Sequence, residues 1–333
     1  MSILSRALDA TILLSFDRTG FRRHAAAFRP EDLEVDLAGR VALVTGANSG
    51  IGKATSRALA ERGAEVFLLC RHEERGRAAL GELRRATGSR RLRLVTVDVA
   101  EPDSVQSAAE AIGAERVHLL VNNAGVLPDE RRENSRGVEM TFATNLLGPF
   151  QLTRLLEPRL RAAGRARIVN VSSGGMYARR LSLGDWGFAK RRFDGVVAYA
   201  EAKRALVVLT ELWAERLAGS GVTANAMHPG WADTPAVETS LPRFRRALQS
   251  RLRTAEEGAD TVVWMSVCPR LENETGRFYF DREPRPTHLL PWTREEPGDR
   301  RRLWELCERL LDAGPPSGPT AGPPLGPARL PLS

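Results

Sequence analysis

Short apolar runs alternate along the chain with longer stretches in which apolar residues recur every three or four positions. The short runs are rich in Val, Leu and Ile and are too short for helices, as expected of parallel strands buried on both faces. These runs cover residues 41–45, 65–70, 92–97, 117–121, 166–171 and 222–227. The helical stretches cover residues 50–62, 102–113, 142–163 and 198–218. The repeated strand-helix order predicts an α/β fold with a doubly wound parallel sheet and right-handed crossovers.

This pattern defines one domain, over residues 39–283, which a seventh strand near residues 276–281 completes. An extension over residues 284–312 contains a helical pattern near residues 299–313. Residues 313–333 are rich in Pro and Gly and contain few apolar side chains that could be buried, which predicts a disordered tail. We therefore expect a single folded domain of about seven strands, followed by a short extension and a tail.

Residues 1–38 carry a weaker pattern, in which Leu4, Leu8 and Ile12 recur four positions apart and predict a short amphipathic helix. A secretory signal would need a small-residue cleavage site after its apolar stretch, and charged residues beginning at Asp17 follow here instead. We expect this helix to pack on the domain. Contact with a membrane surface is the alternative.

Composition narrows the classes of function. The sequence has 49 Lys plus Arg against 41 Asp plus Glu, a formal net charge of +8. These basic residues are scattered in twos and threes among acids, which indicates solvated faces rather than a nucleic-acid surface. The three cysteines fit neither a closed disulfide framework nor a metal site, and they favour a reducing compartment. No apolar run approaches the roughly 20 residues of a membrane span. We expect a cytoplasmic protein without metal or nucleic acid, with peripheral association with an intracellular membrane as the alternative.

A glycine-rich turn directly follows the first expected strand and opens the first expected helix. It contains Gly46, Asn48, Ser49, Gly50, Ile51 and Gly52. Glycines at this place allow a tight turn and a close approach of the backbone to a pyrophosphate, whose charge is met by N–H groups at the start of the helix. In this context the turn predicts a dinucleotide-binding site.

The Gly-x3-Gly-x-Gly spacing of this turn resembles that of the short-chain dehydrogenase/reductase family. Further motifs follow in the family's order, at the carboxyl ends of expected strands or at the start of a helix, where a doubly wound sheet binds its ligands. They are Asn122-Asn123-Ala124-Gly125, Ser172-Ser173, Tyr199 with Lys203, and Pro229-Gly230 with Thr234. The resemblance implies a Rossmann-type oxidoreductase that transfers a hydride between a nicotinamide cofactor and a carbonyl or alcohol. It also implies cofactor contacts at Asp98, Asn123, Ala124, Gly125, Pro229, Gly230 and Thr234.

Hydride transfer to or from a carbonyl carbon requires a proton to move at the oxygen, so a general acid/base must be present. Tyr199 is the candidate, and Lys203 lies one helical turn away, where an ammonium lowers the pKa of a phenol. The family's pattern favours Ser173 over Ser172 as the hydroxyl that binds the carbonyl oxygen. The resemblance further implies that Lys203 binds the nicotinamide ribose and that Asn145 holds a water linking Lys203 to solvent.

The end of the second expected strand determines cofactor choice. An acid there would bind the ribose 2′-hydroxyl, whereas Arg71 offers a guanidinium suited to a 2′-phosphate. We therefore predict NADP(H) in preference to NAD(H). Reduction is the expected direction, because cellular NADP pools are usually kept reduced.

The segment between Ser173 and Tyr199 is longer than the shortest spacing in the family and includes Trp186, Phe188 and Phe193. We predict that these aromatic residues cover the nicotinamide pocket and bind a hydrophobic aldehyde or ketone, such as a lipid-derived, retinoid-like or steroid-like compound. The alternative is that this segment is a surface loop that does not contact the substrate.

A homo-oligomer is compatible with the sequence. The alternative function is a catalytically weak dinucleotide-binding interaction or redox-sensing protein on the same fold.

Overall fold

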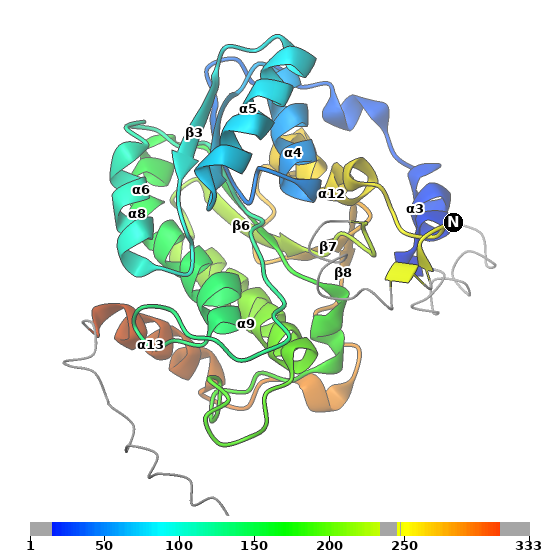
Figure 1. Ribbon diagram of the computed structural model, residues 1–333. Coiled ribbons are helices and arrows are strands. Elements are labelled where there is room, and N and C mark those ends of the chain that lie inside the picture. The colour runs from blue at the N-terminus through cyan, green and yellow to red at the C-terminus, as the bar shows by residue number, and fades with distance from the viewer. Residues whose placement is uncertain (1–14, 234–244, 247, 314–333) are drawn as a thin grey trace, which may run out of the picture.

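The computed structural model describes residues 15–233, 245–246 and 248–313, and in this part of the chain one eight-stranded sheet lies between two layers of helices (Figure 1). The strand order is β3-β2-β1-β4-β5-β6-β7-β8. Neighbouring strands are parallel, except that β7 and β8 are antiparallel. The strands are β1 Val41–Thr45, β2 Glu65–Cys70, β3 Leu92–Thr96, β4 Leu119–Asn122, β5 Ala166–Val171, β6 Val222–Met227, β7 Phe278–Phe280 and β8 Glu283–Arg285.

Most positions of the central strands β1 and β4 are apolar because consecutive side chains enter two different cores. Leu43 and Leu120 belong to the core on one face of the sheet, whereas their neighbours Val44 and Val121 belong to the core on the other face. Side chains of a strand alternate between faces, so a sheet covered on both sides needs a nearly continuous apolar run. This requirement explains why the strands were visible in the sequence.

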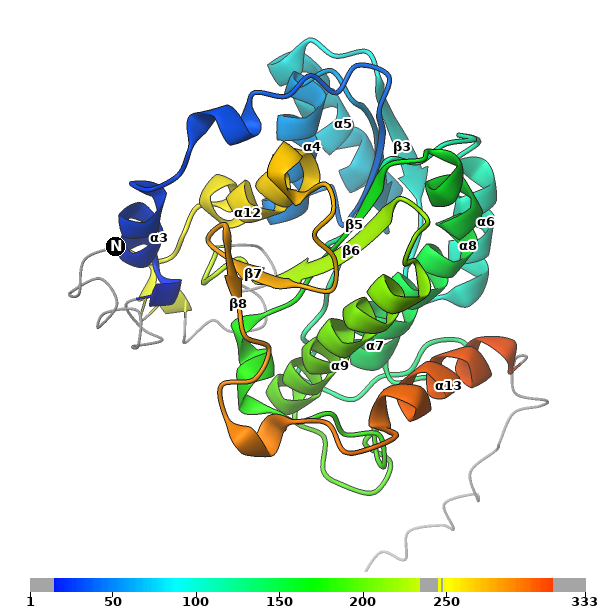
Figure 2. The same cartoon turned by 180° about the vertical axis from the view of Figure 1, so that it is seen from behind.

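The helices divide between the two faces, as Figures 1 and 2 show from opposite sides. One layer consists of α4 Gly50–Glu61, α5 Glu73–Thr87 and α12 Ala255–Val267. The other contains α6 Pro102–Ala111, α7 Met140–Phe142, the π-helix η2 Ala143–Leu147, α8 Gly148–Ala162 and α9 Gly195–Arg216. Beside β7 and β8 lies α3 Arg18–Ala25. The 3-10 helices are η1 Pro30–Leu33, η3 Gly174–Ala178, η4 Pro269–Leu271 and η5 Pro291–Thr293.

The C-terminal extension packs onto α9. In α13, Asp299–Asp312, the Trp304 ring lies 4.9 Å from that of Trp213 in an edge contact. The fully buried Arg204 of α9 donates to the Thr287 carbonyl at 2.6 Å and pairs with Glu295 at 2.9 Å. A buried guanidinium is stable only with such partners, so these contacts hold the loop before α13 firmly against the domain.

The predicted doubly wound sheet and the helix at residues 299–313 are confirmed. The sheet has one strand more than expected, because Glu283–Arg285 pairs with β7, and the expected boundary after residue 283 therefore falls inside β8. The amphipathic helix predicted around residues 4–12 and the predicted disorder of residues 314–333 lie outside the described residues. None of the described helices has the length and apolar character needed to cross a membrane.

Candidate active site

The glycine-rich turn between β1 and α4 is shaped by very close backbone contacts. Gly46 and Gly50 have φ values of +66° and +51°, in the left-handed region that favours glycine. A Cβ on Gly52 would lie 2.4 Å from the Gly46 carbonyl oxygen and 2.5 Å from Asn123 Nδ2. Ser49 precedes the helix without capping it through its side chain, so N–H groups of the first turn remain available to an anion. The turn thus fits the pyrophosphate of a dinucleotide.

The end of β4 is fastened to this turn. The Thr45 hydroxyl accepts hydrogen bonds from the backbone N–H groups of Asn123 and Ala124, both at 2.9 Å. In return, Asn123 Nδ2 donates to the Thr45 carbonyl at 2.9 Å. The structure therefore brings two of the predicted cofactor residues, Asn123 and Ala124, against the glycine-rich turn.

Substituting Gly52 by alanine is expected to weaken NADPH binding by at least about tenfold, or about 1.4 kcal/mol. The added Cβ would overlap a backbone carbonyl, which moves only if the whole turn shifts. Gly81→Ala within α5 is the matched control, because its Cβ would approach only the end of the Arg85 side chain, at 3.5 Å. Fluorescence titration of both variants measures Kd, and an unchanged Kd for Gly52→Ala would refute this role.

The two adjacent serines at the end of β5 have different surroundings. The Ser172 hydroxyl is buried and donates to the Lys203 carbonyl at 2.9 Å, so it is occupied by the backbone of α9. Ser173 is partly exposed, and its hydroxyl lies close enough to the Tyr199 side chain to lower the pKa of the phenol. Of the two, only Ser173 is therefore placed beside the predicted general acid/base.

Lys203 lies close to both Tyr199 and Asn145. Its ammonium is buried, donates to the Val171 carbonyl at 2.8 Å and lies 5.6 Å from the centre of the Tyr199 ring. A Cβ on Gly125 would lie 2.9 Å from Asn145 Oδ1 and 3.5 Å from Lys203 Nζ. The lack of a side chain at Gly125 thus leaves space between the lysine and the asparagine.

Asn145 occupies the π-helix between α7 and α8. Its side chain pairs with the backbone of Val126, accepting from the N–H at 3.0 Å and donating to the carbonyl at 2.9 Å. The wider π turn departs from the regular α-helical ladder, as often occurs at functional sites. These contacts fix the asparagine next to Lys203, and its water-holding role stays a prediction.

The protonation preferences differ from the sequence expectation. Burial raises the pKa of Tyr199, and the hydrogen bond from Ser173 only opposes that rise. Burial also lowers the pKa of Lys203, to about 7. We expected the lysine to lower the pKa of the phenol, but desolvation is the larger effect here, and it weakens the positive charge of the lysine as well.

The other predicted cofactor residues lie at the carboxyl ends of their strands. Arg71 is exposed directly after β2, and Asp98 lies after β3, where its carboxylate accepts from the Ala100 N–H at 3.0 Å. Pro229 and Gly230 follow β6. Thr234 lies outside the described residues.

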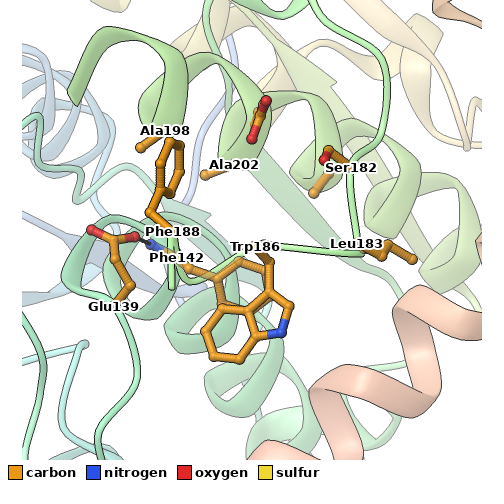
Figure 3. Close-up of a pocket in the computed structure, with 10 residues that line it drawn as sticks. Glu139, Phe142, Ser182, Leu183, Trp186, Phe188, Ala198 and Ala202 are labelled. Atoms are coloured by element: carbon orange, nitrogen blue, oxygen red, sulfur yellow. Dashed lines mark hydrogen bonds between the residues drawn. The ribbon is translucent and has the colours of Figure 1, made fainter. Parts of the chain in front are cut away.

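The aromatic residues after η3 are packed against the domain. The rings of Trp186 and Phe142 are 4.6 Å apart (Figure 3). The ring of the buried Phe188 lies 5.2 Å from that of Phe193. The cavity that Trp186 and Phe188 line has about 10 Å³ of free space, room for one water at most. Arg191 adds a bidentate ion pair to Glu201 of α9. In this structure the aromatic side chains hold the loop down, and their contact with substrate stays a prediction.

Two residues near the site, Phe16 and Arg253, had no signal in the sequence. Phe16 contacts Gly174, which immediately follows Ser173. Arg253 donates to the Pro229 carbonyl at 3.3 Å and forms a buried ion pair with Asp281. Neither Phe16 nor Arg253 lies in a motif, and each meets its partners only through the tertiary fold.

Comparison with known proteins identifies the family. The model of the short chain dehydrogenase family matches residues 40–243. This chain belongs to that family. Dehydrogenase/reductase SDR family member 12 from Bos taurus is 41% identical, over 92% of this chain and 97% of its own length. Retinol dehydrogenase 12 from Homo sapiens is 37% identical, over 83% of this chain and 88% of its own length.

Solved structures agree with this result. A protein from Mycobacterium Paratuberculosis has a TM-score of 0.68 and 30% identity, covering 85% of this chain and 97% of its own. A Brucella melitensis 3-ketoacyl-(acyl-carrier-protein) reductase complexed with NADH has a TM-score of 0.58 and 26% identity, over 73% and 96%. A Pseudomonas aeruginosa RhlG/NADP active-site complex has a TM-score of 0.61 and 25% identity, over 75% and 96%. The short-chain dehydrogenase is thus an NAD(P)-dependent oxidoreductase acting on CH–OH groups, as the sequence predicted.

Proposed function

We propose that this protein is an NADP(H)-dependent reductase of hydrophobic aldehydes or ketones, with Tyr199 as the proton donor. The observation that carries the proposal is the placement of the Ser173 hydroxyl beside Tyr199, with the buried Lys203 ammonium 5.6 Å from the centre of the tyrosine ring. A hydroxyl pair of this kind can bind one carbonyl oxygen from two sides and deliver a proton to it.

The roles follow from the surroundings of each group. Burial keeps the pKa of Tyr199 above its ordinary value, so the phenol is protonated at neutral pH and can donate in the direction of reduction. Ser173 orients the carbonyl oxygen by donating a second hydrogen bond. A bound nicotinamide would supply the hydride. Lys203, which Asn145 and the Val171 carbonyl surround, is available to the nicotinamide ribose and to proton exchange with solvent.

The substrate class rests on two supports. Relatives such as the human protein named retinol dehydrogenase 12 have names that indicate a large apolar alcohol. The loop over residues 178–194 carries aromatic side chains beside the start of α9 and could contact such a substrate if it moved. We therefore assign hydrophobic carbonyl compounds rather than sugars or short hydroxy acids.

A substrate panel tests the proposal. Oxidation of NADPH is followed at equal concentrations of aliphatic aldehydes, ring ketones, retinal, sugars and short keto acids. We expect the highest kcat/KM among the apolar compounds. NADPH binding without turnover of any carbonyl would instead indicate a dinucleotide-binding protein with weak catalysis.

Cofactor preference rests on Arg71, which is exposed at the end of β2, and not on Lys53, which is paired with Glu82. We expect NADPH to bind more tightly than NADH by about tenfold, since a hydrogen bond to a charged group contributes about 1.5 kcal/mol. Arg71→Ala should reduce this difference. Arg77→Ala, on the exposed side of α5, is the control that should leave it unchanged. Titration of the three proteins with both cofactors measures the three affinity ratios, and equal affinities in the unmodified protein would contradict the preference.

A further inference from the structure

The segment that precedes α3 places an aromatic ring next to the proposed active site. A Cβ on Gly174 would lie 2.5 Å from Cε2 of Phe16, so the ring rests directly on the backbone of the residue that follows Ser173. On its other sides Phe16 meets His228 at 4.4 Å and Phe280 at 5.1 Å between ring centres. The ring is nevertheless partly exposed, so packing does not enclose it completely.

The backbone around Phe16 is fixed to the loop that follows β6. The Phe16 carbonyl accepts from the Trp231 N–H at 2.9 Å, and the Arg18 N–H donates to the Arg251 carbonyl at 2.8 Å. The backbone is therefore held at Phe16 itself and two residues later, at Arg18. The loop after β6 carries Pro229 and Gly230, which we assign to the cofactor, so the same loop joins Phe16 to the nicotinamide side of the site.

The side chain of Arg253 also holds the backbone around Phe16. Its guanidinium donates to the carbonyls of Ser15 and Phe16, both at 3.0 Å. The two terminal nitrogens of the guanidinium form a bidentate ion pair with Asp281, at 2.5 and 2.8 Å, and Asp281 also binds His24 at 2.6 Å. The side chains of Arg253, Asp281 and His24 are all buried. A buried network with every partner in place makes the position of the Phe16 segment rigid.

Trp231 completes an apolar surface with Phe16. The two rings meet edge to face, with centres 6.0 Å apart, and Trp231 is also partly exposed. Gly174 separates this pair from Ser173 and adds no side chain between them. A substrate whose carbonyl oxygen lies between Ser173 and Tyr199 would therefore have this pair of rings within reach of the carbon atoms beside its carbonyl group.

We propose that Phe16 determines substrate specificity, forming with Trp231 the wall that limits branching at the carbon next to the carbonyl. This inference rests on the proposed function and adds a side of the pocket that the loop over residues 178–194 does not provide. In Figure 1 that loop lies below α9, whereas α3 and the segment before it lie at the edge formed by β7 and β8. Two distant parts of the chain thus flank the reacting groups.

The test compares isomers that differ only in branching. Octanal and 2-ethylhexanal serve as the aldehyde pair, with 2-octanone and 3-methyl-2-heptanone as the ketone pair. The measured quantity is kcat/KM for the branched isomer divided by kcat/KM for the straight-chain isomer. In Phe16→Ala this ratio should rise by about tenfold, because the smaller side chain leaves room for the branch and one or two methylene groups in an apolar pocket usually have an effect of this size. Phe28→Ala is the control, because that ring is also partly exposed but packs on Phe21 and Arg282 instead. Its ratio should stay within twofold of the unmodified protein, and NADPH Kd should not change in either variant.

Two further variants keep the test decisive if Phe16→Ala folds poorly. Phe16→Leu retains most of the volume and should raise the ratio less than alanine does. Gly174→Ala places a methyl group against the ring and should lower the ratio, an effect that the double variant with Phe16→Ala should cancel. A ratio that stays constant in these variants, or that moves equally in Phe28→Ala, overturns the role of Phe16. The absence of turnover for every carbonyl in the unmodified protein overturns the proposed function itself.

Discussion

Tyr199→Phe is expected to lower kcat by about a hundredfold or more, the usual contribution of a general acid. The substitution removes the phenol hydroxyl beside Ser173 and leaves the ring next to Lys203. Because only one oxygen is lost, the fold and the affinity for NADPH should remain. Single-turnover measurements with saturating cofactor separate the chemical step from binding.

Tyr177→Phe is the matched control for this prediction. Tyr177 lies in η3, four residues after Ser173, but its hydroxyl donates only to the Pro286 carbonyl at 3.1 Å, and burial raises its pKa to about 12. Its loss should cost about 1 kcal/mol of stability and leave kcat nearly unchanged. If Tyr199→Phe retained more than a tenth of the activity, or if both variants lost it equally, the assignment of the proton donor would be wrong.

Arg253→Met should produce the largest loss of stability, about 3–5 kcal/mol in the free energy of unfolding, because it leaves Asp281 charged and buried without its main partner. The exposed pair of Arg57 and Glu61 provides the control, and Arg57→Met should change the free energy of unfolding far less, because solvent screens an exposed ion pair. Urea unfolding at constant pH gives both values. A loss in Arg253→Met no larger than that in Arg57→Met would contradict the structural role of the buried network.

The pH dependence of the same network has a defined sign. Burial alone would raise the pKa of Asp281, but the hydrogen bond to His24 and the charge of Arg253 lower it below the ordinary value of 3.8. A carboxyl group whose folded pKa is depressed stabilises the protein above its unfolded pKa, and this contribution disappears as the pH falls through the folded value. Arg253→Met should therefore also flatten the acid limb of the stability profile below about pH 4.

The sequence was informative where chemistry is local. Strands buried on both faces need short runs rich in apolar residues, and such runs predicted β1, β2, β5 and β6. The glycine-rich turn was predictable because only glycine tolerates the contacts of Gly52. In contrast, β8 consists of Glu283, Pro284 and Arg285, a composition that indicates a turn. Its pairing with β7 comes from the tight connection after β7, which no periodicity reveals.

The residues of the site could be predicted from the sequence, but the directions of their pKa shifts could not. The spacing of Tyr199 and Lys203 identifies a tyrosine-lysine pair, yet the direction of their pKa shifts depends on how deeply the fold buries both groups. The roles of Phe16 and Arg253 could not be predicted from the sequence for a different reason. The two residues are 237 positions apart in the chain, and a contact between such distant positions leaves no local sequence pattern.

The network that fixes residues 15–24 also sets an order for folding during synthesis. His24 meets Asp281 across 257 residues, so its partner leaves the ribosome only when most of the chain has been made. A nascent chain that ends before residue 281 would already contain the glycine-rich turn and the Tyr199–Lys203 pair, but it would lack the carboxylate that binds both His24 and Arg253. Contacts of such long sequence separation form late. Residues 15–24 are thus translated early but complete their native contacts late.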